Sequence, residues 1–231
     1  MENACVSDLP ARVGAFSGAL AALTAEHLQR SVGGRIGIVL TPLSGLAVLN
    51  LRAAPAAAVL AEAVQHGLGL PLPTAVFGSA TDATGCARAL WIGPGDWLIV
   101  CRETDRTLVA AQLKAALDGH SGALTDVGHG WAGVNLRGQA AAAVLASGCG
   151  LDLDPRVFRP GHCAMTGFGK LRVVIERRPD GARGADGVAP PGQSYDVLVA
   201  RSFAASLWHM LVEAAGEHGY RVALPAESGQ D

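Results

Sequence analysis

The chain has 231 residues, half of them hydrophobic and only 16% charged, with a formal net charge of −2 and a sequence pI near 6.4. This charge balance excludes the broad basic surface of a nucleic-acid-binding protein. The length suits one large domain or two small ones, and a mean hydropathy of +0.30 supplies ample material for a buried core.

Cysteine usage and the hydropathy pattern exclude further classes. The five cysteines form no C-x-x-C pair, which argues against a disulfide scaffold and a structural zinc site. No hydrophobic run is long enough to span a bilayer, and acidic Glu2 and Asp8 precede the apolar stretch 13–23, unlike a signal peptide. We therefore expect a cytoplasmic protein, with no membrane partner, whose thiols stay reduced: Cys5, Cys86, Cys101, Cys149 and Cys163.

The first expected unit covers residues 35–128 and follows an N-terminal extension, 1–34, that shows no clear strand. Its expected elements are strands 35–40 and 47–51, helix 55–66, strands 88–92 and 97–101, helix 106–117 and strand 122–127. The later helix carries Val109, Leu113, Ala116 and Leu117 on one stripe. From the second of these strands onward the order is β-α-β-β-α-β, which is ferredoxin-like.

The second expected unit, residues 129–224, repeats the first. Its expected elements are strand 132–136, helix 139–147, strands 171–176 and 195–199, helix 203–215 with Ser202 as its N-cap, and strand 220–224. A loop at 179–192, rich in glycine and proline, interrupts the central hairpin, and a tail follows at 225–231.

The two units share a sequence signature. Leu49-Asn50-Leu51-Arg52 recurs 85 positions later as Val134-Asn135-Leu136-Arg137, and an alanine-rich helix follows each copy. Alternation predicts that the leucines and Val134 face the core. We therefore predict an α+β fold made of two tandem ferredoxin-like units.

Two groupings suggest catalysis without supporting it. His162 and Cys163 are neighbours, so in an extended segment their side chains point to opposite faces and cannot act together. Ser121, Asp126 and His129 are a hydroxyl, a carboxylate and an imidazole within nine residues, but no G-x-S-x-G elbow accompanies them. Turn residues flanking a strand explain these three more simply.

Cofactor and metal motifs are also missing from the sequence. Gly33-Gly34-Arg35-Ile36-Gly37 lacks the dinucleotide-binding spacing, and the seven scattered histidines form no metal-ligand pair. Arg52 and Arg137 are expected to be solvated or internally paired. We therefore assign no catalytic or metal-binding residue and leave cofactor-binding residues unassigned.

Several stretches resemble one known family, the gamma subunit of heterotetrameric sarcosine oxidase. The similarity spans about residues 35–220 and is most specific from Asp152 to Ala164. Its stretches are 88–100 (RALWIGPGDWLIV), 125–127 (TDV), 145–158 (LASGCGLDLDPRVF), 160–166 (PGHCAMT), 201–204 (RSFA) and 207–208 (LW). The chain departs from the family pattern at Gly128-His129 and in the length of the 179–192 loop.

The resemblance implies a fold, a complex and a role. The fold is related to the folate-binding aminomethyltransferase domain of the glycine cleavage system. The complex oxidatively demethylates sarcosine to glycine, yields hydrogen peroxide, and releases the one-carbon unit as formaldehyde or 5,10-methylenetetrahydrofolate. FAD, FMN, NAD and tetrahydrofolate are then held by partner chains, the alpha, beta and delta subunits, and this chain binds none of them.

Two functions of different classes remain open from the sequence. One is a structural, non-catalytic gamma subunit, and the alternative is a stand-alone folate-binding one-carbon protein of the aminomethyltransferase type. For the first, we expect the partner interface to use aromatic residues at the hairpin turn and at the start of the second unit. These are Trp91, Trp97 and Trp131.

Overall fold

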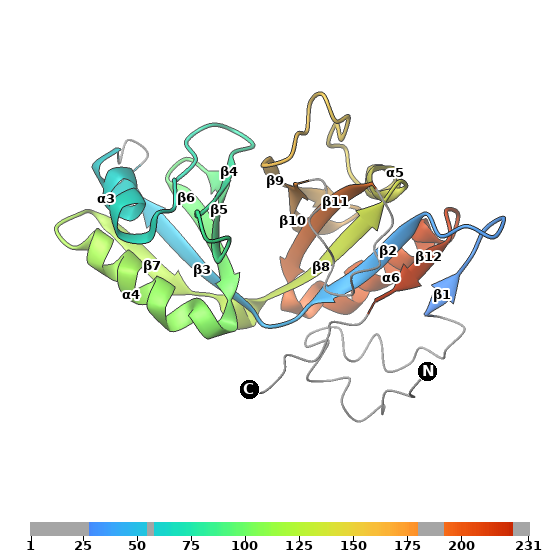
Figure 1. Ribbon diagram of the computed structural model, residues 1–231, viewed down its shortest axis with the longest axis horizontal. Helices are drawn as coiled ribbons and strands as arrows, with labels where there is room; N and C mark the ends of the chain where they lie inside the picture. Colours follow the sequence, from blue (N-terminus) through green and yellow to red (C-terminus); the bar gives the residue numbers. More distant parts are fainter. Residues whose placement is uncertain (1–27, 55–57, 180–191, 224–231) are drawn as a thin grey trace. The chain divides into compact units, whose positions relative to one another are not determined.

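The structure, a computed structural model, describes residues 28–54, 58–179 and 192–223. It is a mixed α+β fold, as predicted, and divides into two compact units (Figure 1). The five-stranded unit comprises Gly45–Trp131 and Gly161–Met165. The seven-stranded unit comprises the described residues up to Ser44, Ala132–Pro160, and the described residues from Thr166 onward.

The five-stranded unit is an antiparallel sheet with two helices. Its elements are β3 (Leu46–Ala53), α3 (Ala58–Leu68), β4 (Ser79–Thr81), β5 (Ala87–Gly93), β6 (Asp96–Arg102), α4 (Arg106–Leu117) and β7 (Gly122–Asp126), with 3-10 turns at Glu103–Asp105 and Gly128–Gly130. The strand order is β4-β5-β6-β3-β7, and every neighbouring pair is antiparallel. The bounds of α4 are those predicted, whereas β4 was not predicted.

The core of this unit lies between the sheet and its two helices. Leu49 and Leu51 of β3 are 1% and 0% exposed, whereas Arg52, the next residue along the strand, is exposed. The predicted alternation of these residues is therefore confirmed. The helices α3 and α4 lie side by side on one face of the sheet (Figure 1). Their buried stripes complete the core with Leu60, Val64, Val109, Leu113 and Ala116.

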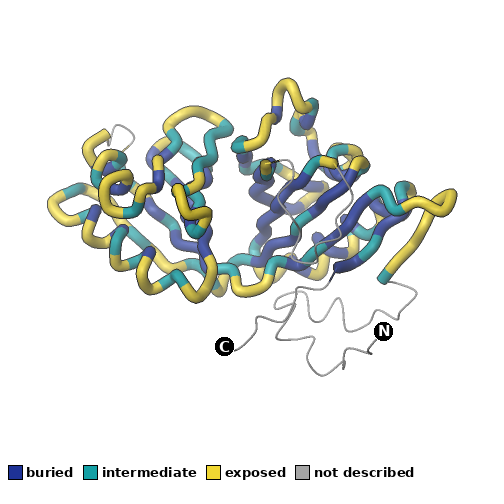
Figure 2. Tube along the Cα trace, viewed as in Figure 1, coloured by how far each residue is buried: buried dark blue, intermediate teal, exposed yellow. Residues whose placement is uncertain are grey.

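The seven-stranded unit is built on a mixed sheet. Its elements are β1 (Gln29–Arg30), β2 (Ile38–Leu43), β8 (Trp131–Gly138), α5 (Ala141–Ala146), β9 (Cys163–Phe168), β10 (Leu171–Arg178), β11 (Gln193–Ala200), a 3-10 turn at Arg201–Phe203, α6 (Ala204–Ala215) and β12 (Tyr220–Val222). The strand order is β1-β12-β2-β8-β11-β10-β9. Val134 and Leu136 of β8 are both 0% exposed, as the repeat predicted, and Figure 2 shows this centre of the sheet as buried.

The placement of β2 differs from the prediction. The sequence places its strand in the first unit, but β2 pairs in parallel with β12 and antiparallel with β8. Ile38, Val39 and Leu40 are each no more than 2% exposed, so both faces of β2 are covered. A strand that is apolar on both faces belongs in the middle of a sheet, and the centre of the seven-stranded sheet provides that position.

Smaller differences concern strand β9 and the entrance to α6. β9 was not predicted, because its sequence Cys-Ala-Met-Thr-Gly-Phe does not alternate between apolar and polar residues. Ser202 makes no capping hydrogen bond, and Phe203, the expected first residue of this helix, is 49% exposed and precedes α6. A 3-10 turn at Arg201–Phe203 precedes the helix and turns both residues away from its buried face.

Three predicted segments fall partly or wholly outside the described residues. The extension 1–34 is described only from residue 28, where β1 pairs with β12 although no strand was expected. Nearly all of the 179–192 loop and the whole 225–231 tail lie outside the described residues.

Candidate functional site

Trp97, one of the three tryptophans predicted at a partner interface, is a core residue. It is 4% exposed and belongs to the apolar cluster between the sheet and α3 and α4. Its indole Nε1 donates a hydrogen bond to the carbonyl oxygen of Pro73 at 2.7 Å. With its ring buried and its donor satisfied, Trp97 lacks the exposure that an interface anchor requires.

Trp91 and Trp131 have different surroundings from Trp97. Trp91 lies directly opposite Trp97 on the neighbouring strand, is half-buried and packs against the same core. Trp131 is half-buried at the first position of β8. Both residues are partly exposed, and their role at an interface remains a prediction.

His162 and Cys163 sit where β9 begins and do not form a catalytic pair. The Cys163 thiol is fully buried and donates to the carbonyl oxygens of Gly78 at 3.0 Å and Trp91 at 3.4 Å. The imidazole of His162 stacks on the ring of Phe77, with centroids 6.4 Å apart. Cys163 is therefore a packing residue that ties this segment to the five-stranded sheet.

Asp126 has a structural role at the end of β7. Its carboxylate accepts hydrogen bonds from the backbone N–H of Gly128 at 3.1 Å and from Arg106 Nη1 at 2.7 Å. These two donors, the backbone one most, hold the pKa of Asp126 below its usual range. Arg106 and Gly128 occupy the carboxylate, as expected for a turn residue and unlike the orienting acid of a triad.

The repeated Asn-Leu-Arg motif builds a polar pair in each unit. Asn50 Nδ2 donates to Asp96 Oδ1 at 2.6 Å, and Asn135 Nδ2 donates to Asp196 Oδ1 at 2.6 Å. Each amide also donates to a backbone carbonyl on the same partner strand. The sequence shows the motif as a repeat, whereas its hydrogen-bonding role depends on strand pairing, which local patterns do not predict.

A buried polar cluster surrounds Asp196 in the seven-stranded unit. Arg178 contacts Glu176 Oε1 at 3.0 Å and Asp196 Oδ2 at 3.6 Å, and the two carboxylates lie opposite each other on β10 and β11. Both acids are at most 5% exposed. The arginine offsets the cost of burying two acids, so this cluster fastens the central strands together.

The stretch most specific to the family resemblance forms a self-capped turn. Asp154 accepts from the backbone N–H and Nε of Arg156 and pairs with its Nη2 at 2.7 Å. These bonds lower the pKa of Asp154 to about 2. The turn leads into Phe158, which is 1% exposed and stacks on Tyr195. The stretch therefore anchors a loop to the core.

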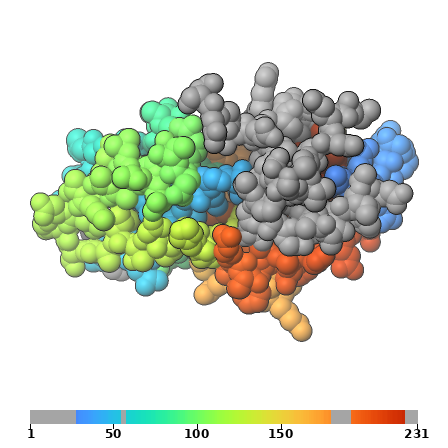
Figure 3. Space-filling view, turned by 90° about the horizontal axis from the view of Figure 1, so that it is seen from below, coloured from blue at the N-terminus to red at the C-terminus, as the bar shows by residue number. Residues whose placement is uncertain are grey.

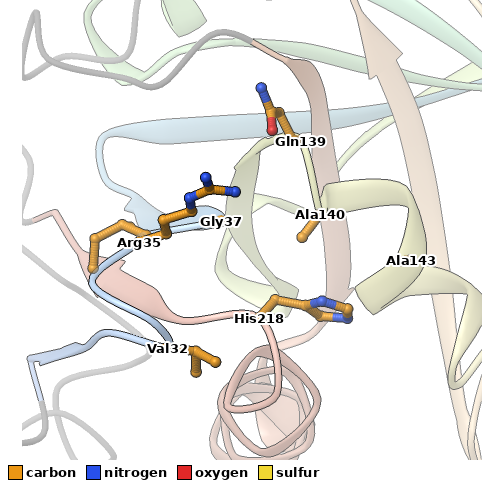
Figure 4. A pocket seen from close by; sticks show the side chains of 8 residues that line it. Val32, Arg35, Gly37, Gln139, Ala140, Ala143 and His218 are labelled. Atoms are coloured by element: carbon orange, nitrogen blue, oxygen red, sulfur yellow. The ribbon is translucent and has the colours of Figure 1, made fainter.

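The seven-stranded unit contains a pocket of about 780 Å³ (Figure 4). Figure 4 shows the Arg35 side chain reaching across it and the His218 imidazole directed toward Ala143. Gln139 adds an amide, and no carboxylate belongs to the described lining. A pocket lined in this way suits an anion better than a cation. Its lining is completed by Val32, Ile36, Gly37 and Ala140.

The five-stranded unit contains a groove of about 390 Å³ between α4 and strands β3 and β7. Its apolar lining comes from Leu49, Leu124 and two alanines of α4, and its charged side chains are Arg106, Lys114 and Asp126. Arg106 and Asp126 pair with each other, whereas Lys114 forms no ion pair with any described residue. We call this the α4–β7 groove; its remaining lining is Thr107, Ala110 and Ala111.

The described residues provide no metal centre: none of their His, Cys, Asp and Glu side chains gather in groups of three or more that could hold an ion. Four cysteines, all except Cys5, are described and are free thiols. Of the helices that the structure describes, none has the length and hydropathy needed to cross a membrane.

Ionisation of the Cys101 thiol is expected to lower the stability of the fold at alkaline pH. Burial, with help from the carboxylates of Asp105 and Glu103, raises the pKa of its thiol from 9.0 to about 11. Its contribution to stability is therefore complete below pH 9 and is lost as the pH rises through about 11. We expect urea-unfolding stability to fall between about pH 9 and pH 11, and Cys101→Ala to flatten that fall. An unchanged pH dependence in the variant would contradict this assignment.

The two sheets and their helices define an α+β protein with the fold of an aminomethyltransferase. The glycine cleavage system aminomethyltransferase T from Bartonella henselae superposes with a TM-score of 0.58 at 14% identity, over 92% of this chain and 51% of that one. The chain itself belongs to the sarcosine oxidase gamma subunit family, whose sequence model matches residues 52–217.

Individual relatives agree with this family. The chain is 30% identical over 195 residues to the sarcosine oxidase subunit gamma of Corynebacterium sp. strain U-96, covering 84% of this chain and 87% of the relative. It is 31% identical over 196 residues to that of an Arthrobacter species, covering 84% and 89%. In the heterotetrameric sarcosine oxidase from Corynebacterium sp. U-96, solved with pyrrole 2-carboxylate, one chain superposes with a TM-score of 0.72 at 27% identity, over 88% of this chain and 94% of that one.

Proposed function

We propose that this chain is a structural, non-catalytic gamma subunit of a complex that oxidatively demethylates sarcosine to glycine. The supporting observation is the family match over residues 52–217, which includes sheet strands of both units. The proposed complex releases hydrogen peroxide, with formaldehyde or 5,10-methylenetetrahydrofolate as the one-carbon product. The chain would act by holding partner subunits in place.

The structural roles of the two catalytic candidates support a non-catalytic chain. Cys163 is fully buried against two backbone carbonyls, and the carboxylate of Asp126 is held by Arg106 and Gly128. A nucleophile needs access to its substrate, and an orienting acid needs an imidazole to orient. Neither residue meets that requirement.

We further propose that the chemistry belongs to the partner subunits alpha, beta and delta. In this arrangement FAD, FMN, NAD and tetrahydrofolate are bound by those chains, and the assembly works in the cytoplasm. The heterotetramer from Corynebacterium sp. U-96, which contains a chain of the same fold, supports a multi-subunit assembly. A permanent assembly of this kind is expected to bury well over about 2,000 Å² in total.

We also propose that the two units are copies of one ferredoxin-like βαββαβ element. In the five-stranded unit, the four strands of the repeat are β3, β5, β6 and β7 in chain order. They lie in the sheet as β5-β6-β3-β7, that is, second, third, first and fourth. In the seven-stranded unit, β10-β11-β8 begins the same order, but β2 separates β8 from β12. The shared Asn–Asp pairs support a common origin, and β2 is an addition to the second copy.

Co-expression with the partner subunits tests the proposed function. With an affinity tag on this chain, we expect the partners to co-purify and sarcosine oxidation to appear only in the assembled complex. The chain alone should show neither flavin absorbance nor sarcosine oxidation. Trp91→Ala and Trp131→Ala should lower partner retention about tenfold or more, because aromatic side chains dominate interface energetics.

The matched control is Phe203→Ala, which removes an aromatic side chain that is 49% exposed and lies outside the predicted interface. It should retain the partners as the unmodified chain does. A chain that binds labelled tetrahydrofolate and transfers one-carbon units by itself would favour the stand-alone folate protein. A chain that neither retains partners nor binds folate would contradict both functions.

A further inference from the structure

The five-stranded sheet has two edges that the chain treats differently. At the β4 edge, Ser79 N–H donates to the carbonyl of Gly161 at 3.0 Å, and Cys163 N–H donates to the carbonyl of Phe77 at 2.9 Å. Segment 161–163 therefore covers that edge. At the other edge, β7 pairs with β3, and no described residue pairs with its outer side.

The register of β7 identifies which of its backbone groups are open. Val127 N–H donates to the carbonyl of Val48, so the amides of Thr125 and Ala123 also point toward β3. The N–H and C=O groups of Leu124 and Asp126, which alternate with them, point away from the sheet. Leu124 is half-buried and the other four residues of β7 are exposed, so this edge of the strand meets solvent (Figure 2).

β7 has few of the devices that usually protect an edge strand. Its sequence Gly-Ala-Leu-Thr-Asp contains no proline or lysine, and its register with β3 has no bulge. Its single charge, Asp126, pairs with Arg106 at 2.7 Å. A strand edge with open amides is a template for pairing with another strand.

The α4–β7 groove lies beside this open edge. Figure 3 shows the residues of α4 and those that follow it side by side at the surface of the five-stranded unit. Leu124 lies opposite Leu51, and Asp126 lies opposite Leu49, so these side chains share the helix-covered face. Alternate side chains of an added strand would point to the same face. The groove can therefore receive an aliphatic side chain, and Lys114 on its rim has no acidic partner among the described residues.

We propose that an extended segment of another subunit adds to the outer edge of β7. The segment places one aliphatic side chain in the α4–β7 groove and a carboxylate against Lys114, while its backbone pairs with Leu124 and Asp126. This inference rests on the proposed function, because it needs a partner subunit. Charge complementarity favours such a partner over a second copy, whose β7 offers only Asp126, already paired with Arg106.

Variants of α4 in the tagged, co-expressed complex test the occupant of the groove. Ala111→Trp fills the groove, and Lys114→Glu reverses the charge on its rim. Each should lower partner retention about tenfold or more. Ala115→Trp changes an exposed alanine of the same helix outside the groove lining, so it should leave partner retention unchanged. Lys114→Arg keeps the positive charge and should retain the partners as the unmodified chain does. Circular dichroism of each purified variant confirms that it is folded.

Amide hydrogen exchange in the unmodified complex tests the strand pairing directly. We expect the amides of Leu124 and Asp126 to exchange as slowly as those of Ala123 and Thr125. Fast exchange at Leu124, or full partner retention by Ala111→Trp and Lys114→Glu, overturns the proposal. Association of the groove with a second copy, seen as a homodimer by light scattering, overturns the choice of partner. Loss of partners from the unmodified chain contradicts the proposed function itself and is distinct from these results.

Discussion

Replacing Val134 with Asp is expected to lower the free energy of unfolding by about 3–5 kcal/mol, the cost of an unpaired charge in a core. Val134 is 0% exposed in β8, which lies between β2 and β11 in the middle of the seven-stranded sheet. A carboxylate there would be removed from solvent, so the chain must either bury a charge or open the sheet. Urea unfolding of the purified variant measures the loss.

The matched control is Val59→Asp, the same change on the surface. Val59 is 62% exposed in the first turn of α3, where a carboxylate is tolerated and interacts favourably with the helix dipole. Its effect should stay within about 0.5 kcal/mol. Equal losses in the two variants would mean that β8 is not at the centre of the unit's core.

Local patterns were enough to predict most helices and strands of this fold. The alternation of Leu49, Leu51, Val134 and Leu136 predicted strands with one buried face, and all four are at most 1% exposed. The apolar stripe of α4 predicted its bounds, because helix ends and buried faces follow from residue spacing within the helix itself. These features depend on neighbours in the sequence.

The placement of β2 could not be read from local patterns. Residues 38–40 are apolar and predict a strand, but nothing in them selects one sheet over the other. That choice depends on β12 and β8, which lie about 100 to 180 positions later in the chain. A long-range pairing of this kind is set by which sheet can bury both faces of the strand.

The burial of Trp97 in the core could not be predicted from the sequence for a related reason. All residues from Trp97 to Cys101 are buried, so this segment does not alternate between buried and exposed side chains. The sequence pattern therefore does not show which face of β6 packs against α3 and α4. The α4–β7 groove was equally hidden in the sequence. It arises because α4 packs beside the last strand of the sheet, which brings Lys114 and Leu124 to one surface.

Gly138→Ala is expected to destabilise the seven-stranded unit by about 3 kcal/mol or more, through backbone strain and a steric clash together. Gly138 ends β8 with φ +142°, a conformation that other residues rarely adopt. An added Cβ would lie 2.3 Å from the carbonyl oxygen of Gly37 and 3.0 Å from Cα of Ile38. That oxygen accepts the N–H of Ala140 at 3.1 Å at the entrance to α5, so moving it disturbs both β2 and the helix.

Gly45→Ala separates the clash from the strain. Gly45 lies in the turn between β2 and β3 with φ +61°, but nothing lies within 4 Å of the position a Cβ would take. Only the conformational cost applies there, and the expected loss is about 1 kcal/mol. Urea midpoints of the two variants, measured at equal protein concentration, provide the comparison. If Gly138→Ala costs no more than Gly45→Ala, the close approach of β2 to the end of β8 does not constrain the fold. A larger loss at Gly138 means that only glycine allows β2 to occupy the centre of the sheet beside β8.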